Sequence, residues 1–168
     1  MTSTQIDMIT EENDVIGTVT REELRKHNML HRTVILFVFN GNNELYIRKR
    51  SFEKDLYPGL YGASCEGLVF KDETFEDAAE RKLKAELGIE APFLFVRSIR
   101  YKDDKVNYLG HIYAMQFEGQ IKLNKEGAEG KFVDLEKVHE MLEKEKFMPD
   151  MRQVLTKHLR EIKDRALK

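Results

Sequence analysis

The sequence predicts an α/β sandwich built around a mixed β-sheet. Two observations lead to this fold class. Strand-like runs come first, one amphipathic helix stands in the middle, and further strands and terminal helices follow it, an order typical of helices packed on a sheet. With 168 residues, the chain is long enough for one domain and short for two. No repeat or Pro/Gly-rich linker divides it, so we expect a single domain over 1–168 with a short N-terminal extension over 1–12.

The first third of the chain predicts a short helix, a hairpin and a loop. Residues 20–27 begin with Thr-Arg-Glu-Glu, a capping box that starts a helix. The run TVILFVF at 33–39 is β-branched and aromatic, which indicates a buried strand. The turn NGNN and the alternating run ELYIRKR complete a β-hairpin. Segment 55–63 contains Pro58 and two glycines and is predicted to be a loop.

The middle of the chain predicts one well-delimited helix. Thr74 and Asp77 form a second capping box, and Gly88 stands where a helix commonly ends. The apolar stripe of this helix consists of Phe75, Ala79, Leu83 and Leu87. Burial of that stripe against the sheet would turn Lys82 and Glu86 toward a cleft.

The last part of the chain predicts two strands and two helices. The segments 93–101 and 106–117 are strand-like and are separated by the charged turn KDDK. Terminal helices are expected over 134–165, the first over 134–146 and the second starting at Pro149.

The composition argues against several classes of partner. The 28 basic and 30 acidic residues give a net charge of −2, which does not favour binding to nucleic acid or to a membrane surface. No apolar run approaches the roughly 20 residues that span a bilayer. The single cysteine, Cys65, cannot form an internal disulfide, and the N-terminus lacks a secretory pattern. We therefore expect a cytoplasmic protein.

The spacing of residues around the central helix is specific. Gly67 is followed by five residues and Glu73, and after seven more residues Arg81 opens the run RKLKAELGI. This stretch resembles the Nudix box of the MutT-like Nudix hydrolases. The matching positions are Gly67, Glu73, Arg81, Leu83, Glu86, Gly88 and Ile89.

The resemblance extends over nearly the whole chain, from about Glu11 to the FMPD segment. The segments ENDVIGTVTREELRKHNMLHR, RSFEKDLYPGLYGAS and EGAEGKFVDLEKV are similar to the branch that contains isopentenyl-diphosphate isomerase and its hydrolase relatives. The resemblance implies a Nudix α/β/α sandwich. It also implies a pyrophosphohydrolase, dependent on Mg²⁺ or Mn²⁺, whose substrate is a small molecule with a diphosphate, such as a nucleoside diphosphate linked to another moiety.

The helix departs from the Nudix pattern where the family holds its metal. A hard cation needs several oxygen ligands, and the family supplies them from three acids on one helical face. The corresponding residues here are Lys82, Ala85 and Glu86. The resemblance therefore implies a weakened metal site with Glu86 as the retained ligand.

Other acids could supplement this site. Glu66 is a candidate second metal ligand. Glu126 and Glu129 lie where Nudix hydrolases often place a late metal-binding or base-supplying Glu, and with Glu86 they are the candidate catalytic residues.

The comparison with the isomerases is mixed. Arg50 and Lys54 match residues that grip the substrate diphosphate, and Lys82 corresponds to a basic residue in the same role, so all three are candidate substrate-binding residues. The isomerase's catalytic cysteine would align with Glu66, one place beyond Cys65, and one of its metal-binding histidines with Leu68. His31 matches another of those histidines.

Three functions remain open at this point: a Nudix hydrolase, a non-catalytic Nudix-fold protein that binds diphosphates, and an isomerase-like enzyme. The box spacing and the late acids favour the first, and Lys82 and Ala85 favour the second. Arg50, Lys54 and Glu86 are shared with the third. The oligomeric state is also open, with a homodimer among the alternatives.

Overall fold

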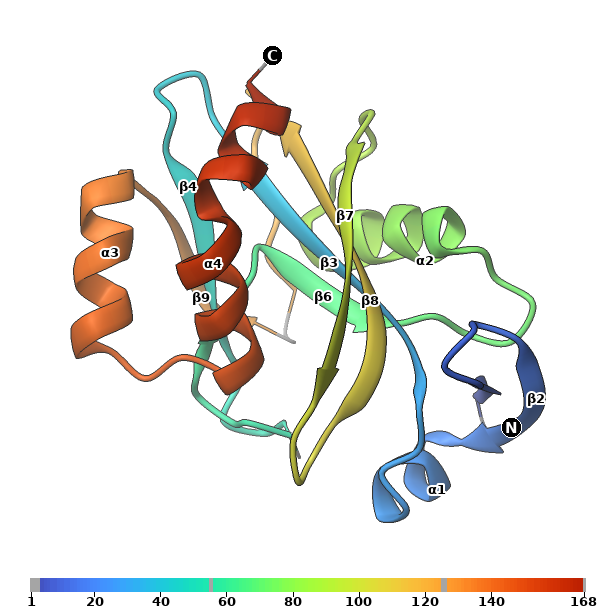
Figure 1. Ribbon diagram of the computed structural model, residues 1–168. Helices are drawn as coiled ribbons and strands as arrows, with labels where there is room; N and C mark the ends of the chain where they lie inside the picture. Colours follow the sequence, from blue (N-terminus) through green and yellow to red (C-terminus); the bar gives the residue numbers. More distant parts are fainter. Residues whose placement is uncertain (1–3, 55, 125–126, 168) are drawn as a thin grey trace.

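The structure is a computed structural model that describes residues 4–54, 56–124 and 127–167 (Figure 1). Seven strands of the described chain form a mixed sheet in which β3, the central strand, is parallel to β8 and antiparallel to β4 and β6. Outside this centre, β7 pairs with β8, while β5 and β9 pair with β4. The strands are β3 (His31–Phe39), β4 (Leu45–Arg50), β5 (Tyr61–Gly62), β6 (Cys65–Leu68), β7 (Leu94–Lys102), β8 (Asn107–Gln116) and β9 (Gly127–Val133).

Helices cover both faces of this sheet. Figure 1 shows α2 (Phe75–Lys82) on one face, with α3 (Leu135–Lys144) and α4 (Pro149–Ala166) on the other. The two apolar cores follow the alternation of β3. Its even-numbered residues Val34, Leu36 and Val38 pack under α2, and its odd-numbered residues Ile35, Phe37 and Phe39 pack under α4. The predicted α/β/α sandwich with a mixed sheet is confirmed.

The central helix begins as predicted and ends differently. The Thr74 hydroxyl accepts a hydrogen bond from the Asp77 N–H, and the Asp77 carboxylate accepts one from the Thr74 N–H, both at 3.0 Å. The prediction of one continuous α-helix to Leu87 is wrong, because η1 (Leu83–Leu87) is a π-helical turn. Gly88 ends this turn in the left-handed conformation with φ +67°, which suits glycine.

The N-terminal segment contains a second, two-stranded sheet that the sequence did not predict, made of β1 (Gln5–Ile9) and β2 (Val15–Thr20). The predicted helix over 20–27 follows it as α1 (Arg21–Lys26), capped by Thr20. Ile6, Val19 and Leu24 form a small third core, and Ile6 also pairs with Phe70. Most of the expected extension over 1–12 therefore belongs to the folded domain.

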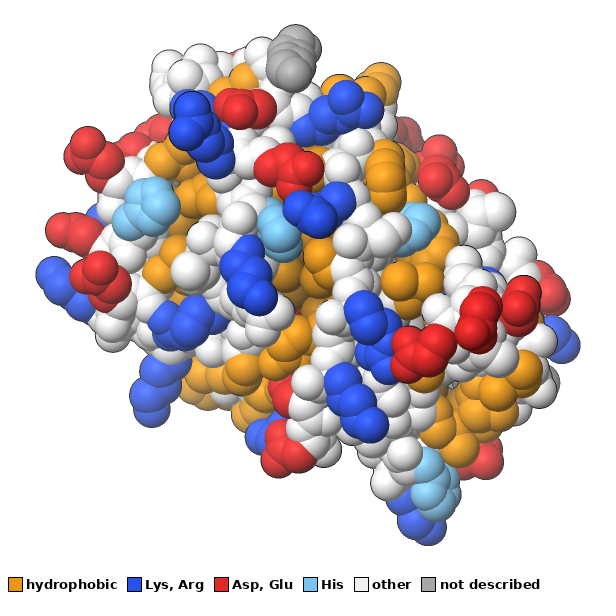
Figure 2. All heavy atoms as spheres, viewed as in Figure 1, with side chains coloured by type: hydrophobic (Ala, Val, Ile, Leu, Met, Phe, Trp, Pro, Cys, Tyr) orange, Lys and Arg blue, Asp and Glu red, His pale blue; other side chains and the backbone are white. Residues whose placement is uncertain are grey.

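The surface agrees with the balanced composition. Figure 2 shows basic and acidic side chains interspersed over the viewed face, without a large area of one sign. Among the described residues, no helix is both long and apolar enough to cross a membrane.

Candidate ligand-binding site

A cavity of about 90 Å³ lies where several elements meet. Its walls come from α1, the first residues of β3 and β8, the end of β4 with the loop after it, β6, the last residue of α2 and the start of α4. This place brings together segments that are distant in the sequence. It also brings together the three predicted substrate-binding residues Arg50, Lys54 and Lys82, all of which line the cavity.

Positive charge dominates the cavity wall. Among the described residues, five cations and two acids line it. The cations are Arg21, Arg25, Arg50, Lys54 and Lys82. The acids are Glu66 and Asp150, and His31 and Tyr108 complete the polar lining. Burial lowers the pKa of His31 to about 4, so the imidazole is neutral at pH 7.

An ion-pair network lies directly behind the cavity. Along β4, the period-two alternation turns Arg48 and Arg50 to one face and Lys49 to the other. The Arg48 guanidinium is bonded to Glu86 through Nη1 and to Glu66 through Nη2, the latter at 3.2 Å. Arg50 donates from Nη1 to the same Glu66 oxygen at 2.9 Å. Arginine suits this role because its planar fork can bond two carboxylates at once.

Glu86 occupies a different environment from the predicted one. Its side chain is 1% exposed and is paired with both Arg48 and Lys82, so it does not face the cleft as we expected. Burial raises the pKa of the Glu86 carboxyl, and the charges of Arg48 and Lys82 act in the opposite direction. A charge this deep persists only when it is paired, which explains the two cations around it. Of the pair predicted to face a cleft, Lys82 alone lines the cavity.

The described acids at and behind the cavity do not fit a resident Mg²⁺ or Mn²⁺. Within the described ranges, no group of three or more His, Cys, Asp and Glu side chains is arranged to hold a metal ion. The two predicted metal ligands, Glu66 and Glu86, are instead bound to guanidinium groups of the protein. Arg48 thus supplies, from within the chain, a positive charge between two acids.

The structure tests one of the two late acids. Glu126 lies outside the described residues. Glu129 is opposite Lys49 in the β4–β9 pair, so it is on the face away from Arg48, where it accepts a hydrogen bond from the Tyr61 hydroxyl at 3.5 Å. The structure therefore does not bring Glu129 to Glu86.

Two other residues of the Nudix box, Glu73 and Arg81, have a structural role. Arg81 donates to both carboxylate oxygens of Glu73, at 2.8 and 2.9 Å, and to the Leu68 carbonyl at 2.9 Å. Glu73 also accepts the Phe70 N–H at 2.7 Å. These bonds connect the loop between β6 and α2 to the end of β6 and to α2 itself.

Cys65 faces away from the cavity. It is fully buried in the core under α2, and burial raises the pKa of its thiol. Its neighbour Glu66 points to the opposite side of β6, where the cavity lies. Cys65 is therefore a core residue.

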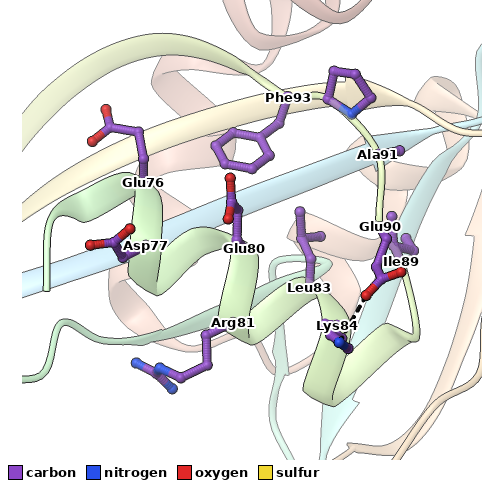
Figure 3. Close-up of a pocket in the computed structure, with 11 residues that line it drawn as sticks. Glu76, Asp77, Glu80, Arg81, Leu83, Lys84, Ile89, Glu90, Ala91 and Phe93 are labelled. Atoms are coloured by element: carbon purple, nitrogen blue, oxygen red, sulfur yellow. Dashed lines mark ion pairs between the residues drawn. The ribbon is translucent and has the colours of Figure 1, made fainter.

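A second hollow lies on the outer side of α2 (Figure 3). It is a larger and more open groove of about 880 Å³ between α2 and the 89–93 segment. Among the described residues, four acids, Glu76, Asp77, Glu80 and Glu90, outnumber the two cations, Arg81 and Lys84, along it, and this net negative charge would repel a phosphate group. None of Arg50, Lys54 and Lys82 lines it, so the smaller cavity is the better candidate site.

Sequence reasoning missed several residues of the cavity. Asp150 follows Pro149 at the start of α4 and looks like an ordinary first-turn acid, yet it is 4% exposed. Arg21 and Arg25 belong to a short helix whose capping box predicts its start but no ligand-binding role. For Arg48, which lies behind the cavity, the alternation of β4 is a signal, because it places Arg48 on the same face as Arg50.

Comparison with known proteins supports the assignment of the fold and of the Nudix box. The NUDIX domain family model matches residues 29–157, and the chain belongs to this family. The uncharacterized Nudix hydrolase YfcD of Shigella flexneri is 29% identical over 126 residues, covering 74% of this chain and 70% of the relative. Isopentenyl-diphosphate Delta-isomerase 2 of Photorhabdus laumondii is 28% identical over 141 residues and covers 80% of each chain.

Solved structures show the same fold. DR0079 from Deinococcus radiodurans superimposes with a TM-score of 0.78 at 22% identity, covering 90% of this chain and 97% of that one. The NUDIX domain of Shewanella oneidensis NrtR, solved with ADP ribose, gives a TM-score of 0.63 at 16% identity, covering 84% and 98%.

Proposed function

We propose that this Nudix-family protein binds a small molecule with a diphosphate group in the cavity between α1, β6 and α4. The observation that carries the proposal is the convergence of five cations on one small cavity. Phosphate oxygens form their strongest hydrogen bonds with Arg and Lys, and several such bonds offset the cost of removing a diphosphate from water. Arg50, Lys54 and Lys82 are the principal diphosphate ligands in this proposal.

The size of the cavity limits what lies inside it. A volume of about 90 Å³ equals roughly three water molecules at about 30 Å³ each. The enclosed part of the ligand is therefore the phosphate group and a short chain. A nucleoside attached to the diphosphate would extend out of the cavity mouth.

Hydrolysis of the bound diphosphate is the second candidate function. The name of the YfcD relative as a Nudix hydrolase supports it, as does the presence of an acid, Glu86, at the last metal-binding position of the box. The pairing of Glu86 with Arg48 and Lys82 argues for slow turnover, because the carboxylate would have to leave two cations to bind a metal. An isomerase-like reaction has less support, since Cys65 does not line the cavity.

Calorimetric titration with inorganic pyrophosphate tests the binding proposal. Lys54→Ala should weaken binding about tenfold or more, because a charged hydrogen bond contributes about 1.5–3 kcal/mol. Lys144→Ala, at an exposed position on α3, is the matched control and should bind like the wild type. Failure of the wild type to bind pyrophosphate, or equal losses in both variants, would contradict the proposal.

A turnover assay then separates the two candidates. Cleavage of the diphosphate bond would be measured with Mg²⁺ and with Mn²⁺, as nucleoside monophosphate formed from nucleoside diphosphate derivatives and as inorganic phosphate formed from isopentenyl diphosphate. Binding without cleavage supports a binding protein. Cleavage that is lost in Glu86→Gln, while this variant still binds pyrophosphate, supports a hydrolase.

A further inference from the structure

The two acids of the cavity lie deeper than four of its five cations. Arg21 is exposed, and Arg25, Lys54 and Lys82 are partly exposed, so these cations form the mouth. The floor consists of Glu66, Asp150 and the fifth cation, Arg50, with side-chain exposure of 9% for both Glu66 and Arg50 and residue exposure of 4% for Asp150. Arg50 is bonded to only one oxygen of Glu66, so a phosphate held at the mouth leaves acceptors of the two acids to be matched by another part of the ligand.

Glu66 presents an acceptor that nothing in the described chain uses. Its Oε1 atom accepts hydrogen bonds from Arg48 and Arg50, at 3.2 and 2.9 Å. Its Oε2 atom is buried and has no hydrogen-bond partner among the described residues. A buried carboxylate oxygen without a donor is costly, so this position favours a ligand that brings one.

Asp150 supplies a second acceptor on the same floor. Its Oδ2 accepts the Tyr108 hydroxyl at 2.6 Å, and its Oδ1 accepts the Met151 N–H at 3.0 Å. Each carboxylate oxygen can accept one further bond. Burial raises the pKa of Asp150 to about 6, and the negative charge of Glu66 acts in the same direction. A donor between the two acids would relieve this repulsion.

We propose that the ligand is a short diphosphate or phosphate ester whose far end carries a hydrogen-bond donor, an ammonium or a hydroxyl group, received by Glu66 and Asp150. The inference rests on the proposed function, since the phosphate end is placed at the cations of the mouth. It adds that the two ends of the ligand differ in chemistry: an anion at one end and a donor at the other. An ester with a purely apolar tail leaves both acids unmatched.

Calorimetric titration with matched esters tests the inference. The 2-aminoethyl, 2-hydroxyethyl and propyl diphosphates have the same number of heavy atoms and differ only at the far end. At least one of the two donor esters should bind the wild type about tenfold or more tightly than the propyl ester, a difference of 1.4 kcal/mol. Inorganic pyrophosphate is titrated in parallel as the measure of the phosphate end alone.

Variants of the floor complete the test. Asp150→Asn and Glu66→Gln should each reduce the preference for the donor ester to about threefold or less while pyrophosphate still binds. Glu143→Gln, an exposed acid on α3, is the control and should keep the preference. Glu66 also pairs with Arg48 and Arg50, so its substitution affects the folded state more than that of Asp150. If Glu66→Gln does not fold, Asp150→Asn alone is sufficient for the test.

The outcomes distinguish the two proposals. Wild-type protein that binds pyrophosphate but shows no preference for either donor ester overturns the inference and leaves the proposed function standing. A preference that survives in both floor variants also overturns it. Failure to bind pyrophosphate or any of the esters overturns the proposed function, and the inference with it.

Discussion

Arg48 of β4 and Glu86 of the π turn form an ion pair in which both side chains are almost fully buried, at 2% and 1% exposure. They are 38 positions apart in the sequence, so the pair joins the sheet to the helix that carries the Nudix box. In Nudix hydrolases this helix holds a metal. Here a guanidinium from the neighbouring strand neutralises its last acid.

The first prediction concerns the energy of this pair. Glu86→Gln leaves Arg48 buried with half of its neutralising charge removed, and should cost about 3–5 kcal/mol in the free energy of unfolding. The double variant Arg48→Met/Glu86→Leu should cost less than the sum of Arg48→Met and Glu86→Leu, by about 1–3 kcal/mol. Urea unfolding of the four proteins measures the coupling.

The matched control is the exposed pair of Lys84 and Glu90. Its atoms are 2.9 Å apart, yet the side chains are 72% and 68% exposed. Its coupling should be at most about 1 kcal/mol, because solvent screens exposed pairs. Equal coupling in the two pairs would mean that burial does not determine the contribution of Arg48.

The second prediction is weak binding of Mg²⁺ to the free protein. Glu66 and Glu86 are engaged by guanidinium groups, and a six-coordinate Mg²⁺ requires more oxygens than they could offer. The affinity should increase when pyrophosphate contributes its own oxygens. Calorimetry with and without pyrophosphate, corrected by a protein-free titration, measures both. Tight binding of Mg²⁺ alone would indicate further ligands, with Glu126 as the first to mutate.

The third prediction concerns Lys82 and Ala85, which replace two family acids. Lys82→Glu with Ala85→Glu should weaken pyrophosphate binding about tenfold or more, because a cation of the cavity becomes an anion. We expect no gain in hydrolysis. Ala85 is exposed while Glu86 is buried, so the π turn does not place the two on one face. Faster cleavage of a nucleoside diphosphate derivative by the double variant than by wild type, measured as nucleoside monophosphate formed, would contradict this expectation.

The fourth prediction is a pair of opposing pH dependences. Burial raises the pKa of Asp150 from 3.8 to about 6, so the folded state retains a proton that the unfolded state loses, and stability falls as pH rises from about 4 to 6. Burial lowers the pKa of His31 from 6.5 to about 4, so the unfolded state binds the extra proton, and stability rises over nearly the same range. The two effects largely cancel in the wild type.

Single substitutions should reveal each contribution. Relative to wild type, Asp150→Asn should become more stable as pH rises from 4 to 6, and His31→Gln should become less stable. Each change should approach about 3 kcal/mol, at 1.36 kcal/mol per pKa unit. Urea unfolding at half-unit pH intervals gives the two difference curves. Flat curves for both variants would show that neither group titrates as its burial requires.

Local chemistry made most of the fold predictable. The capping box at Thr74, the glycine at position 88, the apolar strand at 33–39 and the proline that opens α4 act within a few residues of themselves. Local sequence patterns are therefore enough to predict these elements. They do not predict the π turn, because its apolar residues also fit an α-helix.

The site was less predictable because it depends on contacts between distant segments. Arg50, Lys54 and Lys82 could be placed through the family resemblance, and they do meet in one cavity. Whether Glu86 faces solvent or a guanidinium depends on β4, which lies about forty residues earlier. The environment of Asp150 depends on Tyr108, 42 positions away. No local pattern encodes either relationship.

The position of strand β3 between the two cores has consequences for how the protein unfolds and folds. From Val34 to Phe39 its residues are fully buried, and they belong alternately to the two cores. Exposing this strand to solvent therefore requires both layers to separate at once, so its amide protons should exchange only through global unfolding. Its parallel partner β8 joins it across more than seventy residues, His31 opposite Tyr108. Closing so long a loop is slow, and we expect the β3–β8 pairing to limit the rate at which the protein folds.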